Sequence, residues 1–128
     1  MVGIVIIAHS RTLAEGVAEV ARAMGVDGAV VEPAGGDPDG GLGTSIVAVE
    51  RAVERAADGD GVLLLADIGS SVLTAEMVVE DAREGTVLLA DAPLVEGAVA
   101  AASAAAAGAG LDAVHAAAES ARDHRKRS

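Results

Sequence analysis

His9 is the residue whose type and position best suit a role in catalysis. It directly follows an apolar run at positions 2–8 and precedes a segment with helical spacing. Free N–H groups at a helix N-terminus attract anions, and a neutral imidazole is a competent nucleophile toward phosphorus. A histidine in a loop is also often only structural, so that interpretation stands beside the chemical one. The pattern therefore raises the hypothesis of a phosphoryl group carried on His9.

A carboxylate and several hydroxyl groups follow the other apolar runs. Asp67 comes directly after the third run, and Ser70 and Ser71 come soon after it. Asp67 would either cap a helix or accept a hydrogen bond from one imidazole nitrogen and leave the other free to attack. Ser70 and Ser71 would cap the next helix, bind phosphoryl oxygens, or do both. Ser10, which follows the histidine, is a further candidate phosphoryl contact.

A glycine-rich stretch at 35–45 predicts a loop between the second apolar run and the next helix. Gly35 and Gly36 are the positions at which the loop would come close to a bound phosphoryl group. The stretch lacks the lysine of a nucleotide-binding P-loop and does not fit the dinucleotide fingerprint. Thr44 or Ser45 is expected to cap the helix that follows.

Other chemistries fit these residues less well. A receiver phosphorylated on aspartate needs a lysine near its acidic cluster, and the only lysine is Lys126, close to the end of the sequence. His9, Asp67 and Asp91 would make a poor zinc site, because they offer one histidine and two carboxylates. The sequence has no cysteine and no nucleophile elbow, which argues against thiolate and serine-hydrolase catalysis. We expect neither a metal nor an organic cofactor.

These residues must be positioned by a sheet covered with helices. Apolar runs at 2–8, 29–33, 62–66 and 86–90 have the length and composition of buried strands. Strands separated by helices need right-handed crossovers, which predicts a single-domain α/β fold with an open parallel sheet and helices on both faces. Ligands bind such sheets beyond the carboxyl ends of the strands, where His9 and Asp67 both belong.

The spacing of apolar residues predicts the helices. The first helix is expected to begin at a capping box of Thr12 and Glu15 and to end at Gly25. Alanine is the strongest helix former, so the alanine-rich stretch 94–107 and the segment from 112 onward are expected to be helical too. The residues that mark the helices by recurring every three or four positions are Leu13, Val17, Val20 and Met24, then Ile46, Val49 and Val53, then Leu73, Met77 and Glu80.

Composition limits the domain count and the partners. The 128 residues suit one domain, expected over 1–123, with a basic tail at 124–128. The net charge is −11, from 20 acidic and 9 basic residues, and such a surface repels nucleic acids and anionic lipids. The first residues lack the basic region of a signal peptide, and their apolar run is too short to span a bilayer. We therefore expect a soluble cytoplasmic protein without nucleic-acid or membrane partners.

Three segments together resemble the mannose-type phosphotransferase carrier (EIIA) domains, and within them the branch that serves dihydroxyacetone kinases. The first segment is 3–10 with 13–16, the second is 35–36 with 39–40 and 43–45, and the third is 67–70 with 75–77. The resemblance covers roughly the first three-quarters of the sequence. The Gly-Thr-Ser at 43–45 favours the dihydroxyacetone branch.

The resemblance implies a fold, a site and a set of partners. The fold would have four parallel strands in the order 2-1-3-4, with helices on both faces. His9 would accept a phosphoryl group from the histidine phosphocarrier protein and pass it to ADP on the nucleotide-binding kinase subunit, with Asp67 orienting the ring. The protein would then be a phosphotransferase subunit and a homodimer. The alternatives are the carrier domain of a mannose-family sugar transporter and a regulatory module controlled by phosphorylation of His9.

Overall fold

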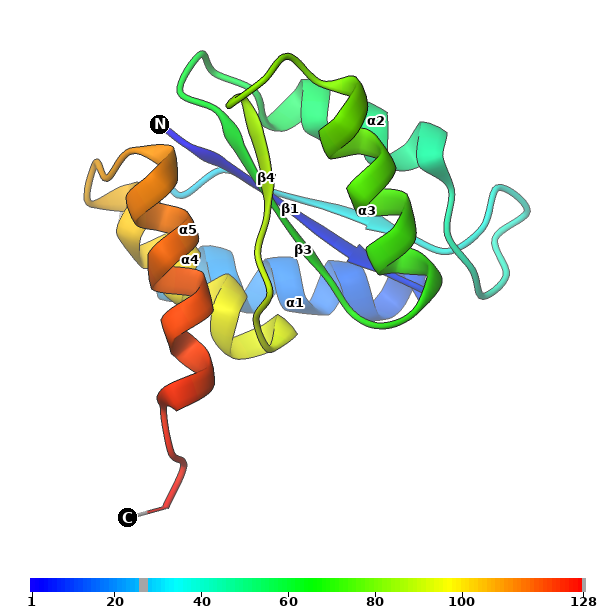
Figure 1. The fold of residues 1–128 in the computed structure, drawn as a ribbon. Coiled ribbons are helices and arrows are strands. Elements are labelled where there is room, and N and C mark those ends of the chain that lie inside the picture. The colour runs from blue at the N-terminus through cyan, green and yellow to red at the C-terminus, as the bar shows by residue number, and fades with distance from the viewer. Residues whose placement is uncertain (26–27, 128) are drawn as a thin grey trace.

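The computed structural model describes residues 1–25 and 28–127, which form a four-stranded parallel sheet between two layers of helices (Figure 1). The strands are β1 (Gly3–Ala8), β2 (Val31–Gly35), β3 (Val62–Ala66) and β4 (Val87–Leu89). Their order across the sheet is β2-β1-β3-β4, and all three neighbouring pairs run parallel. The order that the resemblance implied is therefore confirmed.

The central strands are buried on both faces, as their continuous apolar sequences predicted. Every residue of β1 and of β3 is buried. Alternate β1 residues serve two separate cores, with Ile4 and Ile6 on one face and Val5 and Ile7 on the other. This two-sided burial explains why β1 and β3 read as unbroken apolar runs rather than as alternating ones.

The second strand lies two residues later than the sequence predicted. It was expected at 29–33, but it runs through Pro33 to Gly35, with Pro33 opposite Ile6 of β1. Proline has no N–H to donate, and it is tolerated here because β2 is an edge strand with one neighbour only. This shift places Gly35 inside the sheet rather than in the loop after it.

The helices divide between the two faces of the sheet. Helices α1 (Arg11–Met24), α4 (Leu94–Ala106) and α5 (Leu111–Ser120) pack on one face, and α2 (Ile46–Ala56) and α3 (Ser70–Asp81) pack on the other (Figure 1). A short 3₁₀ helix, η1 (Ala121–Asp123), follows α5. After it, Lys126 Nζ lies 2.9 Å from Glu96 Oε2 on α4. Among the described residues, no helix combines the length and the apolar character needed to cross a membrane.

Alanine builds the helical core, not the larger apolar residues that the sequence analysis followed. The buried residues of α1 are Ala14, Val17, Ala18 and Ala21, and those of α4 include Ala98, Ala101, Ala102 and Ala105. Small side chains let α1 and α4 approach each other and the sheet closely. Leu13, Val20 and Met24, whose spacing marked α1 in the sequence, are instead exposed. On α3 the large residues Leu73 and Met77 are exposed too, while Ala75 and Val78 are buried.

The first helix is capped by a residue other than the one predicted. Ser10 is the N-cap, and its hydroxyl accepts the N–H of Leu13 at 3.1 Å. The capping box of Thr12 and Glu15 is therefore wrong, because the helix begins one residue before Thr12. Gly25 ends α1 as expected, and Ser45 rather than Thr44 caps α2 by accepting the N–H of Ala48.

Candidate functional site

The sheet brings His9 and Asp67 together although 58 positions separate them. Ile7 of β1 lies opposite Ala66 of β3, and the N–H of Asp67 donates to the carbonyl of Ile7 at 3.0 Å. His9 and Asp67 therefore leave two neighbouring strands at the same edge. The His9 side chain is 30% exposed and that of Asp67 is 13% exposed, so solvent reaches the ring more readily than the carboxylate.

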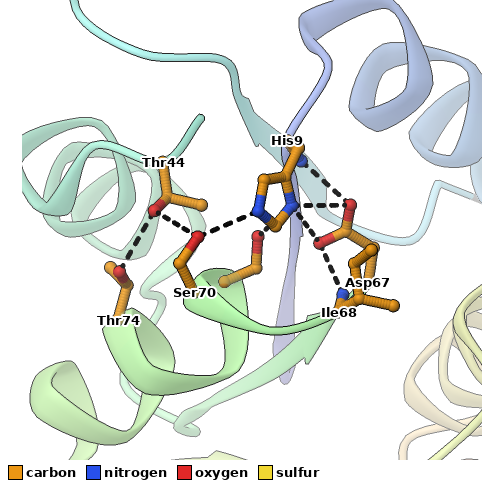
Figure 2. Close-up of polar contacts among 7 residues, drawn as sticks. His9, Thr44, Asp67, Ile68, Ser70 and Thr74 are labelled. Atoms are coloured by element: carbon orange, nitrogen blue, oxygen red, sulfur yellow. Dashed lines mark hydrogen bonds and ion pairs between the residues drawn. The ribbon is translucent and has the colours of Figure 1, made fainter. Parts of the chain in front are cut away.

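The Asp67 carboxylate holds the imidazole through one nitrogen (Figure 2). Nδ1 of His9 lies 3.1 Å from each carboxylate oxygen, and the backbone N–H of His9 donates to Oδ2 at 3.0 Å. An ionised carboxylate can only accept hydrogen bonds, so Nδ1 must carry the proton in the neutral ring. The lone pair of that ring is then on Nε2, which is the atom available as a nucleophile.

The surroundings of Asp67 keep its carboxyl group ionised. Partial burial alone would raise the pKa of Asp67, because it penalises the charge. Hydrogen bonds from the backbone N–H of His9, the hydroxyl of Ser71, the backbone N–H of Ile68 and the His9 ring act in the opposite direction and outweigh burial. The pKa of Asp67 is thus lower than the ordinary value of 3.8, and the carboxylate is charged at neutral pH.

The first turn of α3 supplies hydroxyl groups to both ring nitrogens. Ser70 Oγ lies 2.9 Å from Nε2 of His9, and Ser71 Oγ lies 3.2 Å from Nδ1. The N-terminus of the helix directly after His9 was expected to bind the phosphoryl group, but Ser10 already caps that helix. The N-cap of α3 is Gly69, with φ +49° and no side-chain capping bond, so the serines that follow it are not used as caps.

The other predicted site residues, Ser10, Gly35 and Gly36, shape the backbone around His9 and are not among the contacts of its ring. The hydroxyl of Ser10 is used in capping α1. A Cβ on Gly35 would lie 2.5 Å from the carbonyl oxygen of Ser10, so this glycine lets α1 begin close to β2, and its placement in a flexible loop was wrong. Gly36 has φ +82° and donates its N–H to the carbonyl of Ala8 at 3.2 Å. Contact of Ser10, Gly35 and Gly36 with a phosphoryl group stays a prediction.

Two threonines that the sequence analysis did not assign to the site extend its hydroxyl groups (Figure 2). Thr44 Oγ1 donates to Ser70 Oγ at 3.4 Å, and Thr74 Oγ1 donates to Thr44 Oγ1 at 3.4 Å. Thr74 is four residues after Ser70 on α3, a spacing that puts two side chains on one helix face. That spacing was visible in the sequence, but the approach of Thr44 depends on how the 36–45 loop folds.

The donor set is poor for a metal. Among the described residues, no three histidine or carboxylate side chains are placed to hold an ion together. Asp91, the third residue of the zinc alternative, has its carboxylate 3.2 Å from Arg122 and 90% exposed. The site therefore consists of one imidazole, one carboxylate and four hydroxyls.

Comparison with known families and proteins gives matches along most of the chain. Residues 3–115 match the family described as EIIA-man, PTS system fructose IIA component. A protein of Klebsiella michiganensis named PEP-dependent dihydroxyacetone kinase, phosphoryl donor subunit DhaM, is 46% identical over 120 residues, which are 89% of this chain and 25% of the relative. This chain thus spans about a quarter of the length of that relative.

A shorter relative and a solved structure match over most of both chains. The phosphoryl donor subunit DhaM of PEP-dependent dihydroxyacetone kinase 1 from Listeria innocua is 38% identical over 101 residues, 79% of each chain. The crystal structure of a protein of unknown function is 32% identical, with a TM-score of 0.79 and 92% of each chain covered.

Proposed function

Because this chain belongs to the EIIA-man family of phosphotransferase-system IIA components, we propose that it carries a phosphoryl group on Nε2 of His9 for a PEP-dependent dihydroxyacetone kinase. The observation that carries this proposal is the two-sided environment of the ring. Nδ1 faces an ionised carboxylate, while Nε2 faces hydroxyl groups on the exposed side. One nitrogen is fixed as the proton carrier, and the other is left to react.

The transfer needs no proton to leave the site. The Nε2 lone pair attacks the phosphorus of a phosphohistidine on the donor protein. The new N–P bond forms as the donor N–P bond breaks, and that bonding pair returns to the donor nitrogen. The proton on Nδ1 stays in place, and the Asp67 carboxylate stabilises the positive charge that develops on the ring. In the second transfer a terminal phosphate oxygen of ADP attacks, and the N–P pair returns to Nε2.

The partners follow from the same proposal. The donor is the histidine phosphocarrier protein, and the acceptor is ADP held by the nucleotide-binding kinase subunit. The names of the relatives favour this branch over the carrier domain of a sugar transporter. A homodimer is part of the proposal as well.

Labelling from phosphoenolpyruvate tests the proposal. The protein is incubated with phosphoenolpyruvate and the two general phosphotransferase proteins, and its intact mass is measured. We expect one acid-labile phosphoryl group on the wild type, none on His9→Ala, and normal labelling of His115→Ala. His115 is a fair control, because its Nε2 lies 3.2 Å from Glu119 and from the carbonyl of Leu89, away from the site. An unlabelled wild type beside an active donor would contradict the proposal.

The acceptor is tested by adding the ADP-loaded kinase subunit to the phosphorylated protein. Loss of the label should then depend on that subunit, and dihydroxyacetone phosphate should form once dihydroxyacetone and the subunit that binds it are added. A label that remains on the chain would leave the phosphohistidine but remove the kinase assignment.

A further inference from the structure

The hydroxyl group of Ser70 lies where the incoming phosphorus must bond. Nδ1 carries the proton of the neutral ring, so the contact of 2.9 Å between Ser70 Oγ and Nε2 is one in which the serine donates to the lone pair. That lone pair becomes the N–P bond during transfer. Ser70 must therefore give up its bond to Nε2 and find another acceptor when the ring is phosphorylated.

Thr44 is placed to take part in this exchange. It donates to the Ser70 oxygen at 3.4 Å, and Thr74 donates to Thr44 at 3.4 Å. Hydroxyl hydrogen bonds are strongest near about 2.8 Å, so both threonine contacts are long and are easily exchanged for a better acceptor. A phosphoryl oxygen on Nε2 is such an acceptor, because it carries negative charge.

We propose that Thr44 is a phosphoryl-binding residue, held toward Nε2 by Thr74, and that Thr44 and Ser70 both turn to the phosphoryl oxygens once His9 is phosphorylated. This inference rests on the proposed function of His9. The proton of each hydroxyl stays on its own oxygen, so only hydrogen-bond partners change. Thr74 acts through Thr44 and is a positioning residue.

The charge of the site explains why neutral donors matter here. The ring contacts come from Asp67, Ser70 and Ser71, and Asp67 is itself negative. The phosphoryl group adds nearly two further negative charges next to that carboxylate. Hydrogen bonds from hydroxyl groups, together with the uncapped start of α3, are then the local means of stabilising the dianion.

The decisive experiment measures the phosphorylation equilibrium between the donor protein and this chain. Thr44→Val removes the hydroxyl at nearly constant volume, and Thr44 is only half-buried, so the fold should tolerate it. We expect the equilibrium to shift toward the donor by about tenfold, as for a lost hydrogen bond to a charged group, and the phosphorylated form to hydrolyse faster. Thr44→Ser should restore both values, and Thr74→Val should give a smaller change in the same direction.

A matched control separates this effect from general destabilisation. Thr86→Val also removes a threonine hydroxyl that donates a hydrogen bond, here to the carbonyl of Arg83 before β4. It should leave the equilibrium and the hydrolysis rate unchanged. The inference is overturned if the wild type is labelled and Thr44→Val keeps the wild-type equilibrium, or if Thr86→Val shifts it equally. Absence of label on the wild type would instead remove the proposed function itself.

Discussion

At the scale of single residues, the site depends on the different roles of the two nitrogens of the His9 ring: Nδ1 carries the proton and Nε2 carries the lone pair. Asp67 receives two backbone N–H groups, from His9 and Ile68, so its position does not depend on the ring alone. These two backbone bonds hold the carboxylate in the position from which it orients the imidazole. The effect of the Asp67 charge on transfer and its effect on stability can therefore be measured separately with substitutions of this one side chain.

Replacing Asp67 by asparagine should slow phosphoryl transfer while the protein still folds. The amide keeps the shape of the side chain but loses the charge that favours a proton on Nδ1. We expect at least about a tenfold slower transfer in single-turnover labelling, as for loss of a hydrogen bond to a charged group. Nitrogen chemical shifts of His9 should show more of the tautomer with the proton on Nε2.

Asp91→Asn is the control for this substitution, because it neutralises another carboxylate that follows a strand but is paired with Arg122. Its transfer rate should equal that of the wild type. Unchanged transfer by Asp67→Asn would remove Asp67 from the mechanism.

The lowered pKa of Asp67 also predicts how stability depends on pH. Folding lowers the pKa of this carboxyl group, so the folded state binds a proton less readily than the unfolded state does. Its contribution is therefore fully present above the ordinary value of 3.8 and is lost as the pH falls through the lower folded value. We compare the unfolding free energy of a protein that has Asp67 with that of its Asp67→Asn variant. The difference should be constant above pH 3.8 and should disappear as the pH falls below the pKa of Asp67 in the folded state.

Urea unfolding at a series of pH values measures this difference. Both proteins should carry His9→Ala, because the contact between the ring and the Asp67 carboxylate would otherwise change the same quantity. The backbone N–H groups of residues 9 and 68 remain in that background, so the pKa of Asp67 stays lowered. A difference that disappears well above pH 3.8 would show that these bonds do not stabilise the charged form.

At the scale of elements, the close approach of α1 to β2 fixes the direction in which the chain leaves His9. Gly35 permits this approach, because a Cβ there would meet the Ser10 carbonyl at 2.5 Å and the Ala14 Cβ at 2.8 Å. Gly35→Ala should lower the free energy of unfolding by about 1–3 kcal/mol through overpacking. Gly16→Ala should raise it by about 0.5–1 kcal/mol, because Gly16 is an exposed glycine inside the same helix with open space around its Cβ position.

Denaturant unfolding of the two variants measures both effects. Equal stability of Gly35→Ala and the wild type would show that α1 moves away without cost. In that case β2 does not determine the position of the site.

The elements also show what the sequence could and could not predict. Strands β1 and β3 were predictable, because burial on both faces demands continuous apolar residues, and their shared edge then placed His9 beside Asp67. The buried face of α1 was not, because alanine at Ala14, Ala18 and Ala21 gives a weaker apolar pattern than the exposed leucine, valine and methionine. The contact of Ser70 with Nε2 depends on the rotation of α3 about its axis, which local spacing does not determine.

At the scale of the whole molecule, the proposed transfer brings a negatively charged phosphoryl group to a protein whose net charge is −11. Charge attraction is therefore a weak means of docking, and screening at physiological salt shortens any field to about 8 Å. Exposed apolar side chains instead follow in sequence the residues that contact His9. Ile68 follows Asp67 and is 70% exposed, and Leu73, on the first turns of α3, is 64% exposed.

Ile68 and Leu73 together form an apolar rim, and substitution of Ile68 tests whether this rim binds the phosphoryl donor protein. Ile68→Gln leaves the backbone N–H that donates to Asp67 and changes only the exposed side chain. Loss of one apolar contact at an interface should raise the KM for the donor protein by about fivefold or more, with little change in salt dependence. Met24→Gln is the matched control, since Met24 is 59% exposed and ends α1, about 20 Å along the helix from Arg11. The hydrolysis rate of isolated phosphorylated protein should be the same in all three forms, because no partner takes part. An equal rise in KM for Met24→Gln would show that the donor does not dock at the rim beside His9.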